Sequence, residues 1–93
     1  MAFYQSRNPE EFNYIGVPVS VAVSFKSSGE MLPLQMVVRD MYDNPLRVHI
    51  DGVKYTKDIK GGLSYRMHYM AGTQRRECTL NYYVKVHQWY LEI

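Results

Sequence analysis

The side chains of this chain that are best suited to chemistry are one cysteine and three histidines, Cys78, His49, His68 and His87. Zinc accepts both residue types in tetrahedral sites, and its protein ligands usually come in close pairs such as CxxC or HxxxH. These four residues are far apart in the sequence and form no such pair. We therefore expect solvated histidines rather than a zinc site, and we expect no cofactor.

Cys78 could also serve as a nucleophile if a base lay beside it. It alternates with Leu80 and Tyr82, so it shares the apolar side of a predicted strand with them. Buried cysteine behaves as a small, unreactive hydrophobic residue. The Gly-Gly-Leu-Ser-Tyr run at residues 61–65 lacks the second glycine of a nucleophile elbow and instead predicts the entrance of a strand. The sequence therefore predicts a protein that is not an enzyme.

Basic side chains are concentrated between residues 54 and 76, where Asp58 is the only acid. The cations of this segment are Lys54, Lys57, Lys60, Arg66, Arg75 and Arg76. Tyrosines interleave with them, and cations that follow phosphates beside rings that stack on bases are typical of single-strand nucleic-acid surfaces. These six residues are therefore the candidate nucleic-acid-binding residues. The alternative is an ordinary solvated face, and a net charge of +2 permits either interpretation.

Large apolar and tyrosine side chains also fall on strand faces that we expect to point outward. These side chains are Met31, Val37, Met70, Tyr83 and Tyr90. Several such residues on a wet face suggest contact with a protein partner or with a second copy of the chain. The alternative is a scatter of single apolar residues, which is common on protein surfaces.

The elements that must position these side chains are predicted by a two-residue alternation of apolar and polar residues. The clearest strand covers residues 17–26 and is followed by a turn around Gly29. Further strands are predicted at residues 31–39, 46–55, 63–70, 77–84 and 88–93, with a kink or turn at Asp51-Gly52. Short strands at this spacing predict an all-β, mostly antiparallel barrel or rolled sheet of about five to seven strands.

The length of 93 residues allows one hydrophobic core and therefore one domain. We expect a single β-barrel-like domain at residues 14–93. The segment 1–13 has little periodicity, although Asn8 and Pro9 favour one short helical turn, so it is either such a turn or a flexible tail. The predicted core of the barrel consists of Val19, Val21, Val23, Phe25, Leu34, Met36, Val48, Ile50, Leu63, Tyr65, Met67, Leu80, Tyr82 and Trp89. Leu46 is expected on the same inward face as Val48 and Ile50.

The single cysteine allows no intramolecular disulfide, and small secreted domains usually depend on such bonds. We therefore expect a cytoplasmic protein. The longest apolar stretch, residues 15–23, is too short to span a bilayer and is interrupted by Gly16 and Pro18, so no membrane partner is expected.

A set of strand and turn residues follows in a recognisable order across residues 16–92. It comprises Val17-Pro18-Val19, Gly29, Pro33-Leu34, Ile50-Asp51 with Val53, Lys60-Gly61-Gly62 with Tyr65, and Trp89-Tyr90-Leu91-Glu92. This pattern resembles a family of small bacterial all-β proteins, often encoded beside Y-family (translesion) DNA polymerases. The family usually has Asp-Gly in its last turn, where this chain has Lys85-Val86-His87-Gln88. The resemblance implies a fold, and the gene neighbourhood implies an accessory role near DNA.

Two functional interpretations therefore remain open from the sequence. The first is a non-enzymatic small β-barrel binding module for a protein partner or for self-association. The alternative is a nucleic-acid-binding accessory factor linked to DNA repair or translesion synthesis, which would use the cations between residues 54 and 76.

Overall fold

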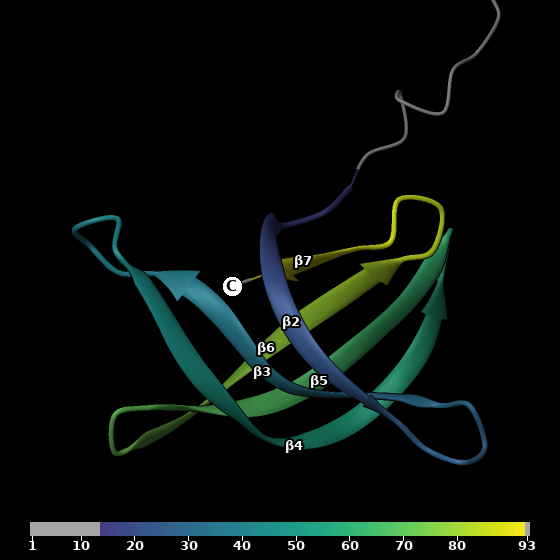
Figure 1. The fold of residues 1–93 in the computed structure, drawn as a ribbon, viewed down its shortest axis with the longest axis horizontal. Coiled ribbons are helices and arrows are strands. Elements are labelled where there is room, and N and C mark those ends of the chain that lie inside the picture. The colour runs from purple at the N-terminus through teal and green to yellow at the C-terminus, as the bar shows by residue number, and fades with distance from the viewer. Residues whose placement is uncertain (1–13, 93) are drawn as a thin grey trace, which may run out of the picture.

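The computed structural model describes residues 14–92, which form a closed barrel of six antiparallel strands (Figure 1). The strands are β2 (Val17–Phe25), β3 (Met31–Arg39), β4 (Pro45–Ile59), β5 (Gly62–Ala71), β6 (Gln74–Tyr83) and β7 (Gln88–Glu92). Each strand pairs with the next one along the chain, and β7 closes the barrel against β2. The predicted all-β antiparallel barrel is therefore confirmed. The helical turn predicted near Asn8 lies outside the described residues.

Two of the strands, β2 and β4, change partner along their length and so belong to both halves of the barrel. One half is formed by residues 20–25 of β2, by β3 and by residues 45–49 of β4; the other half is formed by the rest of β4, by β5, β6 and β7, and by the start of β2. In β2, residues 17–19 pair with β7, whereas residues 20–25 pair with β3. In β4, residues 45–49 pair with β3 and residues 50–59 pair with β5. The register of β4 shifts between Ile50 and Gly52, where the sequence predicted a kink or turn, and β4 bends strongly in Figure 1. This bend carries the sheet around the core without interrupting the strand.

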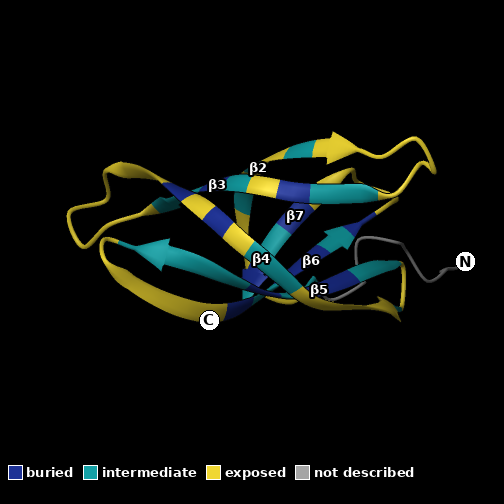
Figure 2. Cartoon of the chain, turned by 90° about the horizontal axis from the view of Figure 1, so that it is seen from below, coloured by how far each residue is buried: buried dark blue, intermediate teal, exposed yellow. Residues whose placement is uncertain are grey.

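The core lies inside the barrel and is built from alternate residues of the strands (Figure 2). Its buried members are Met36, Val48, Ile50, Tyr65, Met67, Cys78, Leu80, Trp89 and Leu91. Trp89 packs against Tyr82 and Tyr65, with ring centroids 4.9 Å and 5.5 Å away. The Tyr65 hydroxyl also donates a hydrogen bond of 3.1 Å to the Met31 carbonyl, which links β5 to β3 across the interior. Most of the predicted core is therefore confirmed.

Leu34 is an exception, because it is exposed although the sequence placed it in the core. Ala22 pairs with Gln35 but the next residue, Val23, pairs with Pro33, so Leu34 is an extra residue in β3. Such a bulge shifts the alternation by one position, which exchanges the faces of the residues beyond it. Pro33 consequently takes a buried position and Leu34 points to solvent.

Phe25 and Leu46 are also exposed, contrary to the prediction. Phe25 is the last residue of β2 and pairs with Met31 at the end of the β2–β3 hairpin. Leu46 lies opposite Val38, beyond the last residue of β3 that pairs with β2. Both side chains sit where the hairpins extend past the closed part of the barrel, so the alternation continues but nothing buries them.

Candidate functional site

The outer face of β4, β5 and β6 carries two cross-strand rows of polar side chains. Their neighbours along each strand, such as Tyr65, Met67 and Leu80, point into the core, so the rows point outward. The two rows are Tyr55–Arg66–Thr79 and Lys57–Ser64–Asn81. The pairing of the three strands therefore brings residues from distant parts of the sequence onto one surface.

A groove of about 340 Å³ runs along these rows, and we call it the polar groove. Lys57, Lys60 and Arg66 supply cationic groups to its lining, and Ser64 and Asn81 line its buried part. The Asn81 side-chain amide donates hydrogen bonds to Glu92 Oε2 at 2.6 Å and to the carbonyl of residue 15 at 3.3 Å. The groove therefore combines cationic, hydroxyl and amide groups with apolar side chains such as those of Ile15 and Ile59.

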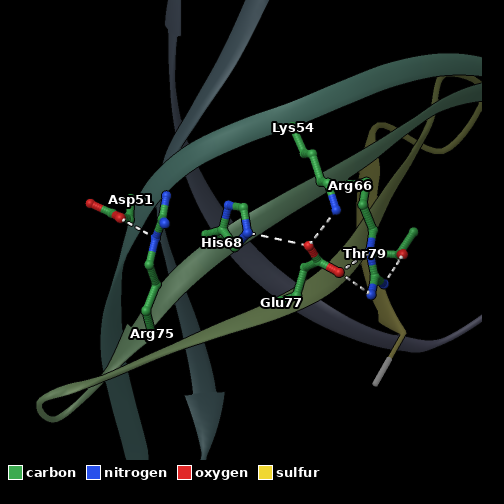
Figure 3. Close-up of polar contacts among 7 residues, drawn as sticks. All are labelled: Asp51, Lys54, Arg66, His68, Arg75, Glu77 and Thr79. Atoms are coloured by element: carbon green, nitrogen blue, oxygen red, sulfur yellow. Dashed lines mark hydrogen bonds and ion pairs between the residues drawn. The ribbon is translucent and has the colours of Figure 1, made fainter.

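Glu77, in β6, is the centre of a charge cluster beside the polar groove (Figure 3). Its carboxylate accepts hydrogen bonds from Lys54 Nζ at 3.0 Å and from Arg66 Nη2 at 2.8 Å. The His68 Nε2 atom lies 3.2 Å from the same carboxylate, and Arg66 Nη1 donates to the Thr79 hydroxyl at 2.9 Å. The hydrogen bonds from Lys54 and Arg66 lower the pKa of Glu77 to about 2. Glu77 therefore holds Arg66 in one orientation at the edge of the groove.

The six predicted nucleic-acid-binding residues separate into two groups. Lys57, Lys60 and Arg66 line the polar groove, and Lys54 adjoins it through Glu77. Arg75 and Arg76 lie near the opposite end of the β5–β6 pair, where Arg75 Nε forms an ion pair of 2.7 Å with Asp51 and Arg76 donates to Gln74. The pairing of β4, β5 and β6, rather than closeness in the sequence, therefore decides which of these cations lie together.

Tyr83 was predicted to form a protein interface, but it is only 3% exposed, which corrects that prediction. The ring of Tyr14 lies 5.0 Å from that of Tyr83, and the ring of Tyr90 lies 5.5 Å away. The backbone amide of Ile15 donates to the Tyr83 hydroxyl at 3.2 Å. The chain just before β2 therefore covers this tyrosine on the outside of the barrel.

The other predicted interface residues also fail to form one exposed patch. Met31 packs against the core instead of pointing outward, which is a second correction. Val37 and Met70 are half-buried, and Tyr90 is half-buried with its ring stacked on Tyr14 at a centroid distance of 5.4 Å. The bulge in β3 and the covering segment at residues 14–15 account for most of this difference.

A second groove, of about 430 Å³, opens between β2 and the β6–β7 hairpin, and we call it the β2 groove. It exists because β7 pairs with β2 only as far as Val19, opposite Trp89. Beyond that point, residues 20–25 have β3 as their only strand partner within residues 14–92. The groove is lined by Val19, Ser20, Val21, Val23, Phe25, Met31, Tyr82, His87, Gln88 and Trp89. A surface of mixed apolar and uncharged polar side chains therefore borders an open strand edge.

Cys78 is buried as predicted, and burial raises the pKa of its thiol to about 11. The thiol is therefore protonated at neutral pH and unsuited to nucleophilic attack. His68 is engaged with Glu77, and His87 Nδ1 lies 3.1 Å from the Tyr82 hydroxyl. Among residues 14–92, no cluster of three or more metal-ligating side chains is present.

Sequence reasoning missed Glu77, Ser64 and the β2 groove. The contacts of Glu77 with Arg66 span β5 and β6, so only the strand register brings the two together. In the sequence, Ser64 belongs to a run that lacks the second glycine of a nucleophile elbow, and no local pattern marks it as buried beside a groove. One feature of the sequence is consistent with the β2 groove. The alternating run at residues 17–26 is longer than the last strand, β7, so β7 cannot pair with all of it.

The closed six-strand sheet, which carries the polar groove and the β2 groove, defines a small antiparallel β-barrel protein. Comparison of the chain with protein-family models, curated proteins and solved structures found no match. The resemblance to the bacterial family encoded beside Y-family polymerases therefore stays a prediction. Within residues 14–92, no helix is long and apolar enough to cross a membrane.

Proposed function

We propose that this protein is a non-enzymatic binding module that takes an extended polypeptide segment of a protein partner along β2. The observation that carries this proposal is the open edge of residues 20–25, which have no strand partner on the β7 side within the described residues. The β2 groove lies along that edge. An added strand would occupy the space that β7 leaves when it diverges from β2.

The physical basis of this binding mode is strand addition. Unpaired N–H and C=O groups at a sheet edge form a template for another extended chain, and alternate side chains of that chain enter an adjoining groove. Residues 20–25 offer roughly 20 Å of strand length at the usual rise per residue. This length suits a peptide of about six residues.

The lining of the β2 groove indicates which peptide would fit. Among the described residues that line it, none is Asp, Glu, Lys or Arg. Phe25 is 67% exposed and lies beside Val23 and Met31, so it offers a large apolar contact without any rearrangement of the core. The fitting partner is therefore a segment with apolar side chains at alternate positions, and charged segments are disfavoured.

The test begins with a selection of random ten-residue peptides displayed on phage against the folded chain. Phe25→Ala is expected to weaken the selected peptides about tenfold or more, because exposed aromatic anchors dominate such interfaces. Tyr42→Ala is the matched control, since Tyr42 is also an exposed aromatic residue but lies in the β3–β4 turn. This control is expected to leave peptide affinity unchanged.

Hydrogen exchange separates strand addition from other ways of binding. A bound peptide is expected to slow amide exchange within residues 20–25, and N-methylation of alternate peptide amides is expected to abolish binding. Unchanged exchange at these residues, or equal losses in the two alanine variants, would overturn the proposal. Protection of residues 20–25 that depends only on protein concentration would replace it with self-association.

A further inference from the structure

We infer that the polar groove is a second binding site and that its ligand is single-stranded nucleic acid. This site is independent of the proposed peptide site, because the polar groove lies on the outer face of β4, β5 and β6 whereas the peptide site follows β2. Three features of the lining favour this ligand: its charge, an exposed aromatic ring and a buried hydroxyl that has no hydrogen-bond partner within residues 14–92.

The charge of the lining favours a polyanion. Among the described residues that line the groove, Lys57, Lys60 and Arg66 are cationic and Glu92 is the one carboxylate. Arg66 is also paired with Glu77 beside the groove. The lining therefore carries three cations and one acid. Lys54 adds a further cation at the edge, and the Glu77 carboxylate is shared between Lys54 and Arg66. Cations arranged along a groove attract a phosphate backbone through release of its condensed counterions.

Tyr55 supplies a surface on which a base can stack. Its side chain lines the groove and is 52% exposed, although it lies opposite Arg66 in the paired strands. A ring that is half-exposed beside a guanidinium is typical of surfaces that bind unpaired bases. A duplex keeps its bases stacked on one another, so Tyr55 favours a single strand over a duplex.

Ser64 provides the third and independent observation. It is 4% exposed and lines the groove between Lys57 and Asn81 in the same cross-strand row. Within residues 14–92, its hydroxyl forms no hydrogen bond with another side chain or with the backbone. Buried polar groups nearly always have a partner. A phosphate or base oxygen in the groove would supply one, so Ser64 points to a ligand.

The test is fluorescence anisotropy with a fluorescein-labelled oligothymidylate of about ten nucleotides and the full chain. Binding is expected at about 50 mM salt, with a logarithmic salt slope near −2 if three phosphates are neutralised. Lys57→Glu is expected to weaken binding and to reduce the magnitude of the slope by about 0.7. Arg47→Glu is the matched control, because it changes the net charge equally but pairs with Val37 of β3, outside the polar groove.

Two further variants test the ring and the hydroxyl. Tyr55→Ala is expected to weaken the oligonucleotide about tenfold or more but to leave an abasic strand of equal length unaffected. Ser64→Ala is expected to weaken binding with no loss of thermal stability, because the hydroxyl has no partner to lose within the described chain. Circular dichroism confirms that each variant is folded.

Several results would overturn the inference. They are absence of binding at low salt, equal losses in Lys57→Glu and Arg47→Glu, equal affinity for a duplex of the same length, and full affinity for the abasic strand. The first two results would remove the site, whereas the last two would leave a general anion site in place of a single-strand site. Peptide binding at β2 is expected to persist in Lys57→Glu, so failures of the two proposals are distinguishable.

Discussion

Within residues 14–92, the Glu77 carboxylate has more charged partners than any other acidic side chain. It contacts Lys54, Arg66 and His68. Its hydrogen bond also raises the pKa of Arg66, so the guanidinium stays charged beside the polar groove. Removal of the carboxylate would leave two or three cations close together on one sheet face. Glu77 therefore holds these basic side chains in place and neutralises part of their positive charge.

The contacts of Glu77 make the stability of the protein depend on pH. The folded pKa of Glu77, about 2, is below its ordinary value of 4.5. A depressed pKa contributes stability that is fully present above pH 4.5 and is lost as the pH falls through about 2. Glu77→Gln is therefore expected to have a lower Tm than the parent protein at pH 7, with a difference that shrinks between these two values.

Thermal unfolding followed by circular dichroism across this pH range measures the effect. Glu30→Gln is the control, because Glu30 forms only a longer, exposed ion pair of 3.5 Å with Lys26. Its Tm is expected to track that of the parent protein at every pH. A Glu77→Gln deficit that remains constant down to pH 2 would contradict the linkage argument.

At the scale of the element, the start of β5 depends on a close approach of two backbones. A Cβ atom added at Gly62 would overlap the carbonyl oxygen of Tyr82 on the neighbouring strand β6. Glycine at this position therefore lets the β4–β5 hairpin pack against the end of β6. The sequence indicated a flexible strand entrance here, and the contact with Tyr82 gives the physical reason for the residue.

Gly62→Ala is accordingly expected to destabilise the protein by about 2–4 kcal/mol, because backbone on both sides must move. Gly52→Ala is the matched control, since nothing lies within 4 Å of a Cβ atom built there. Its effect is expected to stay within about 0.5 kcal/mol. Urea unfolding of the two variants measures the difference, and equal free energies of unfolding would refute the close-approach argument.

In the molecule as a whole, β2 and β4 each belong to both halves of the barrel. The two halves therefore enclose a single core. Met67 is central to it, fully buried and paired with Val53 on one side and Cys78 on the other. The barrel should therefore unfold as one cooperative unit, as small single domains usually do.

Two probes test this cooperativity. The far-ultraviolet circular dichroism of the strands and the fluorescence of Trp89, the only tryptophan, are expected to give the same urea midpoint. Met67→Ala is expected to lower both midpoints together, with a loss of about 2–5 kcal/mol. Separate transitions for the two probes would show instead that the halves of the barrel unfold independently.

The strands and most of the core can be predicted from the order of the amino acids alone. The strand predicted at residues 31–39 matches β3, and the alternation alone places Met67, Leu80 and Trp89 in the interior, where the structure has them. The physical reason is local: side chains alternate between the two faces of an extended chain, so the apolar face can be read along one strand.

The surfaces of the barrel, in contrast, depend on how distant strands pair. The bulge that exposes Leu34, the cover over Tyr83, the cluster at Glu77 and the divergence of β7 from β2 all arise from pairs of residues far apart in the chain. Strand register and the point at which two strands separate are set by packing of the whole barrel. No alternation within one segment contains that information, because it is a property of the pairing between segments.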